Sequence, residues 1–115
     1  MKSDLPTTFK NGFYIVNLNG SSHWCAVCRD GKDYFYFDSY GFVPPLEVER
    51  CIPKDYIYND KQIQTLGSTA CGFYCVAFCR VMNASKDKLK AYQKFIDSFG
   101  VNSKQNEKIL KQFLS

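Results

Sequence analysis

An almost uninterrupted apolar segment, residues 71–82, constrains the fold of this chain more than any other feature of the sequence. The segment reads as a helix, and a helix that is apolar on every side is stable only when other elements cover it. Its longest unbroken apolar run, Phe73 to Cys79, is far short of the ~20 residues that a membrane span needs. The rest of the chain is therefore expected to wrap around a buried central helix.

Several segments before this helix have the composition of β-strands. Residues 13–18, 23–29 and 34–38 are rich in β-branched and aromatic side chains and are bounded by turn signals. The last two of these segments are joined by a tight turn at 30–33, which predicts an antiparallel pair. A short helix is expected to start at Pro45 or Leu46, and residues 56–58 predict a further short strand.

Two amphipathic helices are expected after the buried one. The first runs from about Lys86 to Phe99 and stops at Gly100, with these residues inward: Leu89, Phe95, Ile96 and Phe99. The second is capped by Asn102 or Ser103 and turns these residues inward: Ile109, Leu110 and Phe113. The predicted class is α+β, an antiparallel or mixed sheet packed on a central helix, with C-terminal helices. We expect a single domain over residues 1–115, with a core at about 13–83 and a helical part at 84–115.

The six cysteines of the chain are expected to be free thiols. They lie inside apolar stretches, and residues 1–18 hold no uninterrupted apolar core that would predict a secretion signal. We therefore expect an intracellular reducing compartment, the nucleus or cytoplasm, rather than secretion. Cys25 and Cys28 form a CxxC pair, but alternation in a strand sends them to opposite faces, and no second pair completes a zinc site. We expect neither a metal nor another cofactor.

Three residues supply the groups of an activated nucleophile: a thiol, an imidazole and a carboxylate. His23 is the single histidine, and Asp38 lies near the end of the next predicted strand, where antiparallel pairing can bring the two side chains together. A carboxylate beside an imidazole fixes its tautomer and stabilises the imidazolium. Cys71 lies where a polar loop meets the buried helix, and unpaired N–H groups at a helix N-terminus favour a thiolate. Gly72 has no side chain to block the approach of a substrate backbone.

These residues belong to stretches that resemble the adenovirus-protease (adenain) family of cysteine proteases. The similar stretches are residues 15–17, Ser22-His23-Trp24, residues 36–42, and residues 64–75 from Gln64 through Cys71-Gly72. More distantly, the chain is similar to the proteases that remove SUMO and related ubiquitin-like proteins. The resemblance covers about residues 13–83 and implies the adenain or papain-like cysteine protease fold.

The resemblance implies a role for each matching residue. Cys71 would be the nucleophile, His23 the general base and Asp38 the group that orients the imidazole. Gln64 would donate its side-chain amide to the oxyanion hole, with Gln62 as the rival. Trp24 and Gly72 are the expected substrate-binding residues. The resulting activity would be that of a cysteine endopeptidase, processing capsid or core precursors of a virus or mobile element, in the host cell and in the virion.

Two other functions stay open. One is deconjugation of SUMO or another ubiquitin-like protein, and the other is a non-enzymatic DNA-binding or adaptor module. Residues 84–115 hold 7 lysines and 3 acidic residues and so carry the whole net charge of +4. The resemblance implies stimulation by DNA or by a peptide partner, for which this tail and Cys51 are the candidates. We otherwise expect a monomer with a polypeptide substrate and no membrane contact.

Overall fold

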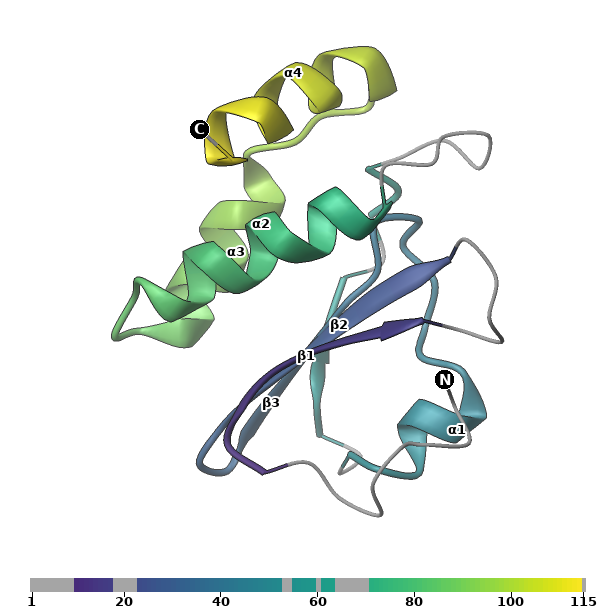
Figure 1. Cartoon of the computed structure of the whole chain (residues 1–115), viewed down its shortest axis with the longest axis vertical. Coiled ribbons are helices and arrows are strands. Elements are labelled where there is room, and N and C mark those ends of the chain that lie inside the picture. Colours follow the sequence, from purple (N-terminus) through teal and green to yellow (C-terminus); the bar gives the residue numbers. More distant parts are fainter. Residues whose placement is uncertain (1–9, 18–22, 53–54, 60, 64–70, 115) are drawn as a thin grey trace.

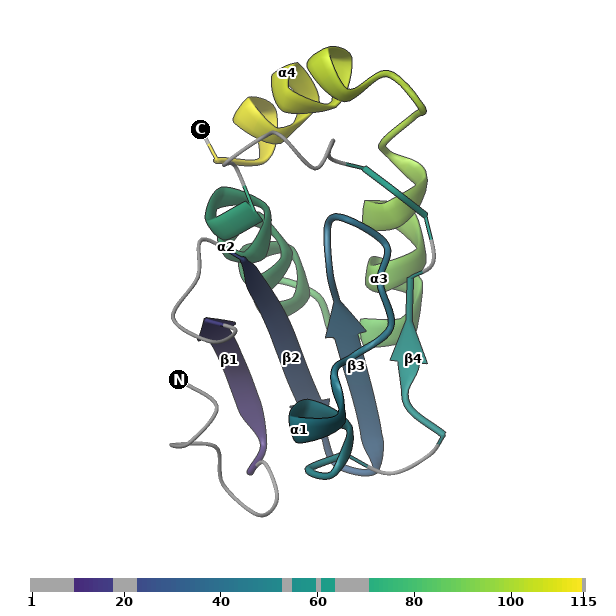
Figure 2. The ribbon, with the colours of Figure 1, turned by 90° about the vertical axis from the view of Figure 1, so that its right-hand side faces the viewer.

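Four strands form one mixed sheet, and different helices cover its two faces (Figures 1 and 2). The computed structural model describes residues 10–17, 23–52, 55–59, 61–63 and 71–114. In chain order the elements are β1 (Gly12–Asn17), β2 (Trp24–Asp30), β3 (Asp33–Phe37), α1 (Leu46–Glu49), β4 (Ile57–Tyr58), α2 (Cys71–Asn83), α3 (Lys88–Asp97) and α4 (Ser103–Leu114). The predicted α+β class is confirmed at this level.

The strand order in the sheet follows the order in the sequence, β1-β2-β3-β4. The first two pairings are antiparallel, whereas β4 runs parallel to β3. Asp30 pairs with Asp33 across the tight turn between β2 and β3, where Gly31 adopts a φ of 63° that favours glycine. The expected Leu18 end of the first strand and the turn after it lie outside the described residues.

Side chains of the central strands alternate between two separate cores, as period-2 geometry requires. Cys28 of β2 faces the layer of α2, α3 and α4, whereas Cys25 faces the opposite layer, which includes Val48 of α1. Figure 2 shows α1 on the side of the sheet away from α2. The expectation that the two cysteines of the CxxC pair point apart is therefore confirmed.

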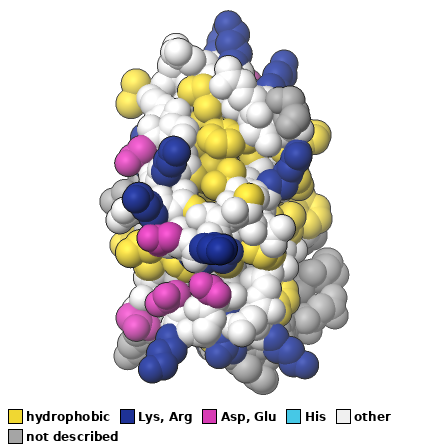
Figure 3. Space-filling model, turned by 90° about the vertical axis from the view of Figure 1, so that its left-hand side faces the viewer, with side chains coloured by type: hydrophobic (Ala, Val, Ile, Leu, Met, Phe, Trp, Pro, Cys, Tyr) yellow, Lys and Arg dark blue, Asp and Glu magenta, His cyan; other side chains and the backbone are white. Residues whose placement is uncertain are grey.

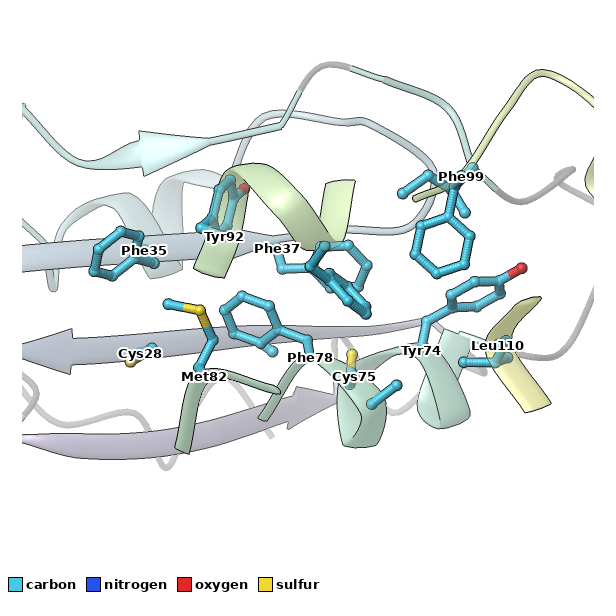
Figure 4. Close-up of a cluster of buried hydrophobic side chains, with 14 residues drawn as sticks. Cys28, Phe35, Phe37, Tyr74, Cys75, Phe78, Met82, Tyr92, Phe99 and Leu110 are labelled. Carbon is cyan, nitrogen blue, oxygen red and sulfur yellow. The ribbon is translucent and has the colours of Figure 1, made fainter. Parts of the chain in front are cut away.

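The larger core is built mainly from aromatic rings between the sheet and the long helices (Figure 4). Phe37 of β3 stacks on Phe78 of α2 with ring centroids 5.2 Å apart, and Phe95 of α3 meets both rings. Each such fully buried ring contributes roughly 1.5–3 kcal/mol through removal of apolar area from water. This packing holds α2 against the sheet, and therefore fixes where the first residue of α2 lies.

The prediction that Leu89 lies on the inner face of α3 is wrong, because its side chain is 45% exposed. The helix begins at Lys88, and the buried residues of this segment are Tyr92, Phe95 and Phe99. With 100° per residue, Lys88 lies in line with these three and Leu89 lies to the side. Lys88 therefore turns inward, where Nζ donates to the carbonyls of Met82 and Ser85 at the end of α2.

The α4 helix is capped by Asn102, one of the two predicted caps, whose side chain accepts from the N–H of Gln105 at 3.1 Å. One turn into the helix, the buried Asn106 donates to the carbonyls of Ile63 and Gly100 and accepts from the Gly100 N–H, all at 2.8 Å. The Ile63 N–H in turn donates to the Ser39 carbonyl at 2.8 Å. The C-terminal helices are thereby tied to the segment that follows β3.

Candidate active site

His23 and Asp38 form a hydrogen-bonded pair at one end of the sheet. His23 lies just before β2 and Asp38 just after β3, and the antiparallel register that pairs Ala26 with Phe37 places both at the same end. Nε2 of His23 lies 2.9 Å from Oδ2 of Asp38. The His23 side chain is 20% exposed and that of Asp38 only 2%. The pair is thus partly shielded from water, which strengthens its electrostatic interaction.

The Asp38 carboxyl is held in a buried environment that also stabilises its charged form. Burial raises its pKa, while the Tyr40 N–H and His23 act in the opposite direction. The Tyr40 N–H donates to Oδ1 at 2.8 Å, so that each carboxyl oxygen has a partner. This arrangement fixes the carboxyl plane relative to the imidazole.

Two aromatic rings flank the imidazole. The Tyr40 ring is stacked on the His23 ring with centroids 4.7 Å apart and planes inclined by 12°, and the Phe42 ring lies 6.5 Å away. These contacts and the Asp38 bond define the orientation of the ring. Because Nε2 faces Asp38, proton exchange with a nucleophile has to go through Nδ1.

Cys71 is the first residue of α2. A Cβ built on Gly72 would be 3.9 Å from Cδ1 of Trp24, so the start of α2 adjoins the start of β2. Burial raises the pKa of the Tyr40 hydroxyl, and the neighbouring Cys71 and Asp38 raise it further. The Cys71 side chain is fully buried.

The other thiols lie in surroundings that keep them neutral. Burial raises the pKa of Cys25 to about 12, and that of Cys28 and Cys79 to about 11. Burial also raises the pKa of Cys75 well above its ordinary value, and that of Cys51. None of the six cysteines is in a disulfide. A thiol that stays neutral is a poor nucleophile, so these surroundings do not favour any of the five as a reactive group.

An apolar groove begins beside Cys71. It is lined by Ile15, Trp24, Gly72, Phe73 and Val76, none of which carries a charge. Phe73 is 62% exposed, and Ile15 and Val76 are each 41% exposed. Both expected substrate-binding residues, Trp24 and Gly72, line this groove.

The expected oxyanion donor, Gln64, lies outside the described residues. Its rival Gln62 is exposed and precedes Ile63, which is buried. Sequence reasoning missed Asn59, a buried residue whose side chain bonds to the backbone of Asp38. A polar residue directly after the short apolar strand at 56–58 was the signal that could have found it.

No family model, no curated protein and no solved structure matches the chain. Across the described parts of the chain, no three His, Cys, Asp or Glu side chains gather closely enough to hold a metal ion. Within those same parts, no helix has the length and apolar character needed to cross a membrane.

Proposed function

We propose that the protein is a cysteine endopeptidase that hydrolyses peptide bonds with Cys71 as nucleophile, His23 as general base and Asp38 as the orienting group. The observation that carries the proposal is the 2.9 Å His23–Asp38 pair beside the N-terminus of the helix that begins with Cys71. A thiol, an imidazole and a carboxylate are the groups with which a cysteine protease carries out acyl transfer.

The reaction divides into two acyl transfers. His23 Nδ1 takes the proton of the Cys71 thiol, and the sulfur attacks the substrate carbonyl carbon while the electron pair of the C=O bond moves to oxygen. The Cys71 backbone N–H and the Gln64 amide stabilise this oxyanion. The C–N bond then breaks, and His23 gives its proton to the leaving amine. Water, deprotonated by His23, attacks the thioester and releases the acid and the thiol.

The preferred substrates are capsid or core precursor proteins of a virus or mobile element. This assignment rests on the resemblance to the adenain family, whose order of His-Trp, Asp, Gln and Cys-Gly the chain shares. The uncharged groove beside Cys71 supports a polypeptide substrate with apolar side chains near the scissile bond. Deconjugation of a ubiquitin-like protein is the alternative substrate class, and a peptide panel compared with ubiquitin-like protein probes separates the two.

A second candidate function is a non-enzymatic adaptor or DNA-binding module. The complete burial of Cys71 favours it, because a nucleophile has to meet its substrate. The exposed lysines of α3 and α4 supply a surface for such a role.

The test is proteolysis by the purified chain of a protein mixture and a peptide library, read by mass spectrometry. Cys71→Ala should abolish cleavage while circular dichroism shows an unchanged fold, and Cys79→Ala serves as the matched control on the same helix. Cleavage that persists in Cys71→Ala overturns the assignment of the nucleophile. Absence of cleavage by the parent, together with a Cys71 that electrophilic peptides do not label, favours the adaptor module.

A further inference from the structure

Asn59 lies where the backbone of Asp38 leaves the sheet. The last antiparallel pair between β2 and β3 joins Ala26 and Phe37, so Asp38 lies beyond the end of that ladder. On its other side, β4 runs parallel to β3 with Tyr36 opposite Tyr58, and Asn59 is the next residue of the chain. Buried backbone groups beyond a ladder need other partners.

The Asn59 side chain forms hydrogen bonds with both backbone groups of Asp38. The Asp38 N–H donates to Oδ1 of Asn59 at 3.1 Å, and Nδ2 of Asn59 donates to the Asp38 carbonyl at 2.9 Å. The same Nδ2 donates to the Lys61 carbonyl at 3.1 Å. Asn59 is 4% exposed, so these bonds are shielded from water. The amide therefore extends the sheet by one residue, with a side chain in place of a strand.

A third element supports this arrangement. The buried Tyr92 of α3 donates from its hydroxyl to the Tyr36 carbonyl at 2.7 Å, and Oδ1 of Asn59 lies 3.5 Å from the same hydroxyl. The end of β3, the residue after β4 and α3 thus meet at one polar cluster. This cluster is small and buried, and its geometry is correspondingly rigid.

We propose that Asn59 is a positioning residue that fixes the Asp38 carboxyl against His23. It touches neither His23 nor a reacting atom, and acts only through the Asp38 backbone. The link to catalysis rests on the proposed function, whereas the link to the His23–Asp38 pair rests on the geometry alone. Without Asn59, the Asp38 N–H must find water or a new partner, while the Asp38 carbonyl keeps only the Gly41 N–H at 2.9 Å. The carboxyl is then held less firmly against the imidazole.

The single histidine makes the pair directly observable. In NMR spectra of the full chain, the ring signals of His23 have no overlap from another histidine. The proton between Nε2 of His23 and Oδ2 of Asp38 exchanges with water only when the pair opens, so its exchange rate measures how firmly the pair is held. Other titratable groups that act on Asp38 or share its surroundings are Cys25, Tyr36, Tyr40, Cys71 and Cys75, and they are the same in all variants compared.

Asn59→Ala should speed the exchange of this proton with water about 10-fold, because the pair opens more often when the Asp38 backbone is less firmly held. The matched control is Asn106→Ala, which removes another buried asparagine with backbone partners, in α4. That variant should lower the melting temperature without changing this exchange rate. If Asn59→Ala does not fold, Asn59→Ser, which keeps a polar group at this position, supplies the comparison.

Equal exchange rates in the parent, the Asn59 variant and Asn106→Ala would overturn the positioning role and leave Asn59 as a packing residue. Proteolysis is measured separately on the same samples. A parent that cleaves nothing, with faster exchange still observed in the Asn59 variant, would remove the proposed function and keep the positioning role. In an active parent, Asn59→Ala should lower kcat about 10-fold with little change in KM, because a misplaced catalytic group is felt mainly in the transition state.

Discussion

The ring of Tyr40 lies nearly parallel to the imidazole of His23, with a centroid distance of 4.7 Å. The backbone of the same residue donates to the carboxyl of Asp38. Tyr40 therefore contacts both members of the pair, one through its ring and the other through its N–H. A change of the side chain removes the first contact and leaves the second in place.

Tyr40→Leu should lower kcat about 10-fold, because the imidazole then rotates more freely about its bond to Asp38 and meets the thiol less often. Tyr40→Phe keeps the stacked ring and should retain most of the activity. Steady-state kinetics of both variants with one peptide substrate make the comparison. Equal losses in the two variants would show that the hydroxyl, and not the ring contact, is the part that matters.

Gln64→Ala should lower turnover by ~10²–10³ with little effect on KM, as expected for a donor that acts mainly on the oxyanion of the transition state. Gln62→Ala is the control and should be nearly silent. The measurement is kcat and KM for both variants. The reverse pattern would assign the oxyanion donor to Gln62.

Stability of the fold should fall as the pH rises above about 9. Unfolded thiols ionise near 9.0, whereas burial raises the pKa of Cys25 to about 12 and that of Cys28 to about 11 in the folded chain. The folded state therefore holds protons that the unfolded state releases, and the free energy of unfolding decreases with pH in this window. At pH 10.5 the loss should be about 2 kcal/mol for Cys25.

Urea denaturation at pH 7, 9 and 10.5 measures this loss. Cys25→Ala lacks one such thiol and should lose less stability than the parent between pH 9 and 10.5, although it is less stable at pH 7 because a cavity remains. Parallel pH curves for the two proteins would show that ionisation of Cys25 does not contribute.

Polyanions should bind the lysines of α3 and α4 and raise activity, if the resemblance to a DNA-stimulated protease extends to this part. Six of the seven lysines of residues 84–115 are exposed: Lys86, Lys90, Lys94, Lys104, Lys108 and Lys111. Figure 3 shows basic side chains around an apolar area, with acidic side chains among them. Binding of a DNA duplex should weaken steeply with salt, since release of condensed counterions drives it.

Charge reversal at Lys90, Lys94 and Lys111 should remove DNA stimulation and spare basal peptide cleavage. Lys88 is left intact, because its Nζ bonds to carbonyls at the end of α2 and its loss would disturb the helix pair. Fluorescence anisotropy over a salt series gives the binding, and peptide cleavage gives the activity. Activity that neither DNA nor salt changes would leave these lysines as an ordinary solvated surface.

Most of the sheet and the helix positions were predictable because alternation and apolar spacing are local properties. The proximity of His23 and Asp38 followed from one tight turn between adjacent strands. The parallel direction of β4 depends on the path of residues 38–56, which no local pattern reveals. Asn59 was missed for the same reason, since its partner Asp38 lies 21 positions away.

The error at Leu89 has a different origin. Hydrophobicity alone assigned Leu89 to the core, but the phase of α3 is set by Tyr92, Phe95 and Phe99. This phase turns Lys88 inward, where a lysine is acceptable only because helix-end carbonyls lie within reach of its ammonium group. Such a compensation is a tertiary property, and the sequence pattern does not contain it.

The bond from Asn106 to the Ile63 carbonyl joins residues 43 positions apart. During synthesis the segment that leads toward Cys71 leaves the ribosome well before Asn106 does. The strands and α2 can begin to associate in that interval, but the hydrogen bond from Asn106 to Ile63 forms only after α4 has been synthesised. The hydrogen bond between α4 and Ile63 is therefore among the contacts that a nascent chain forms last, after its C-terminal helix has emerged.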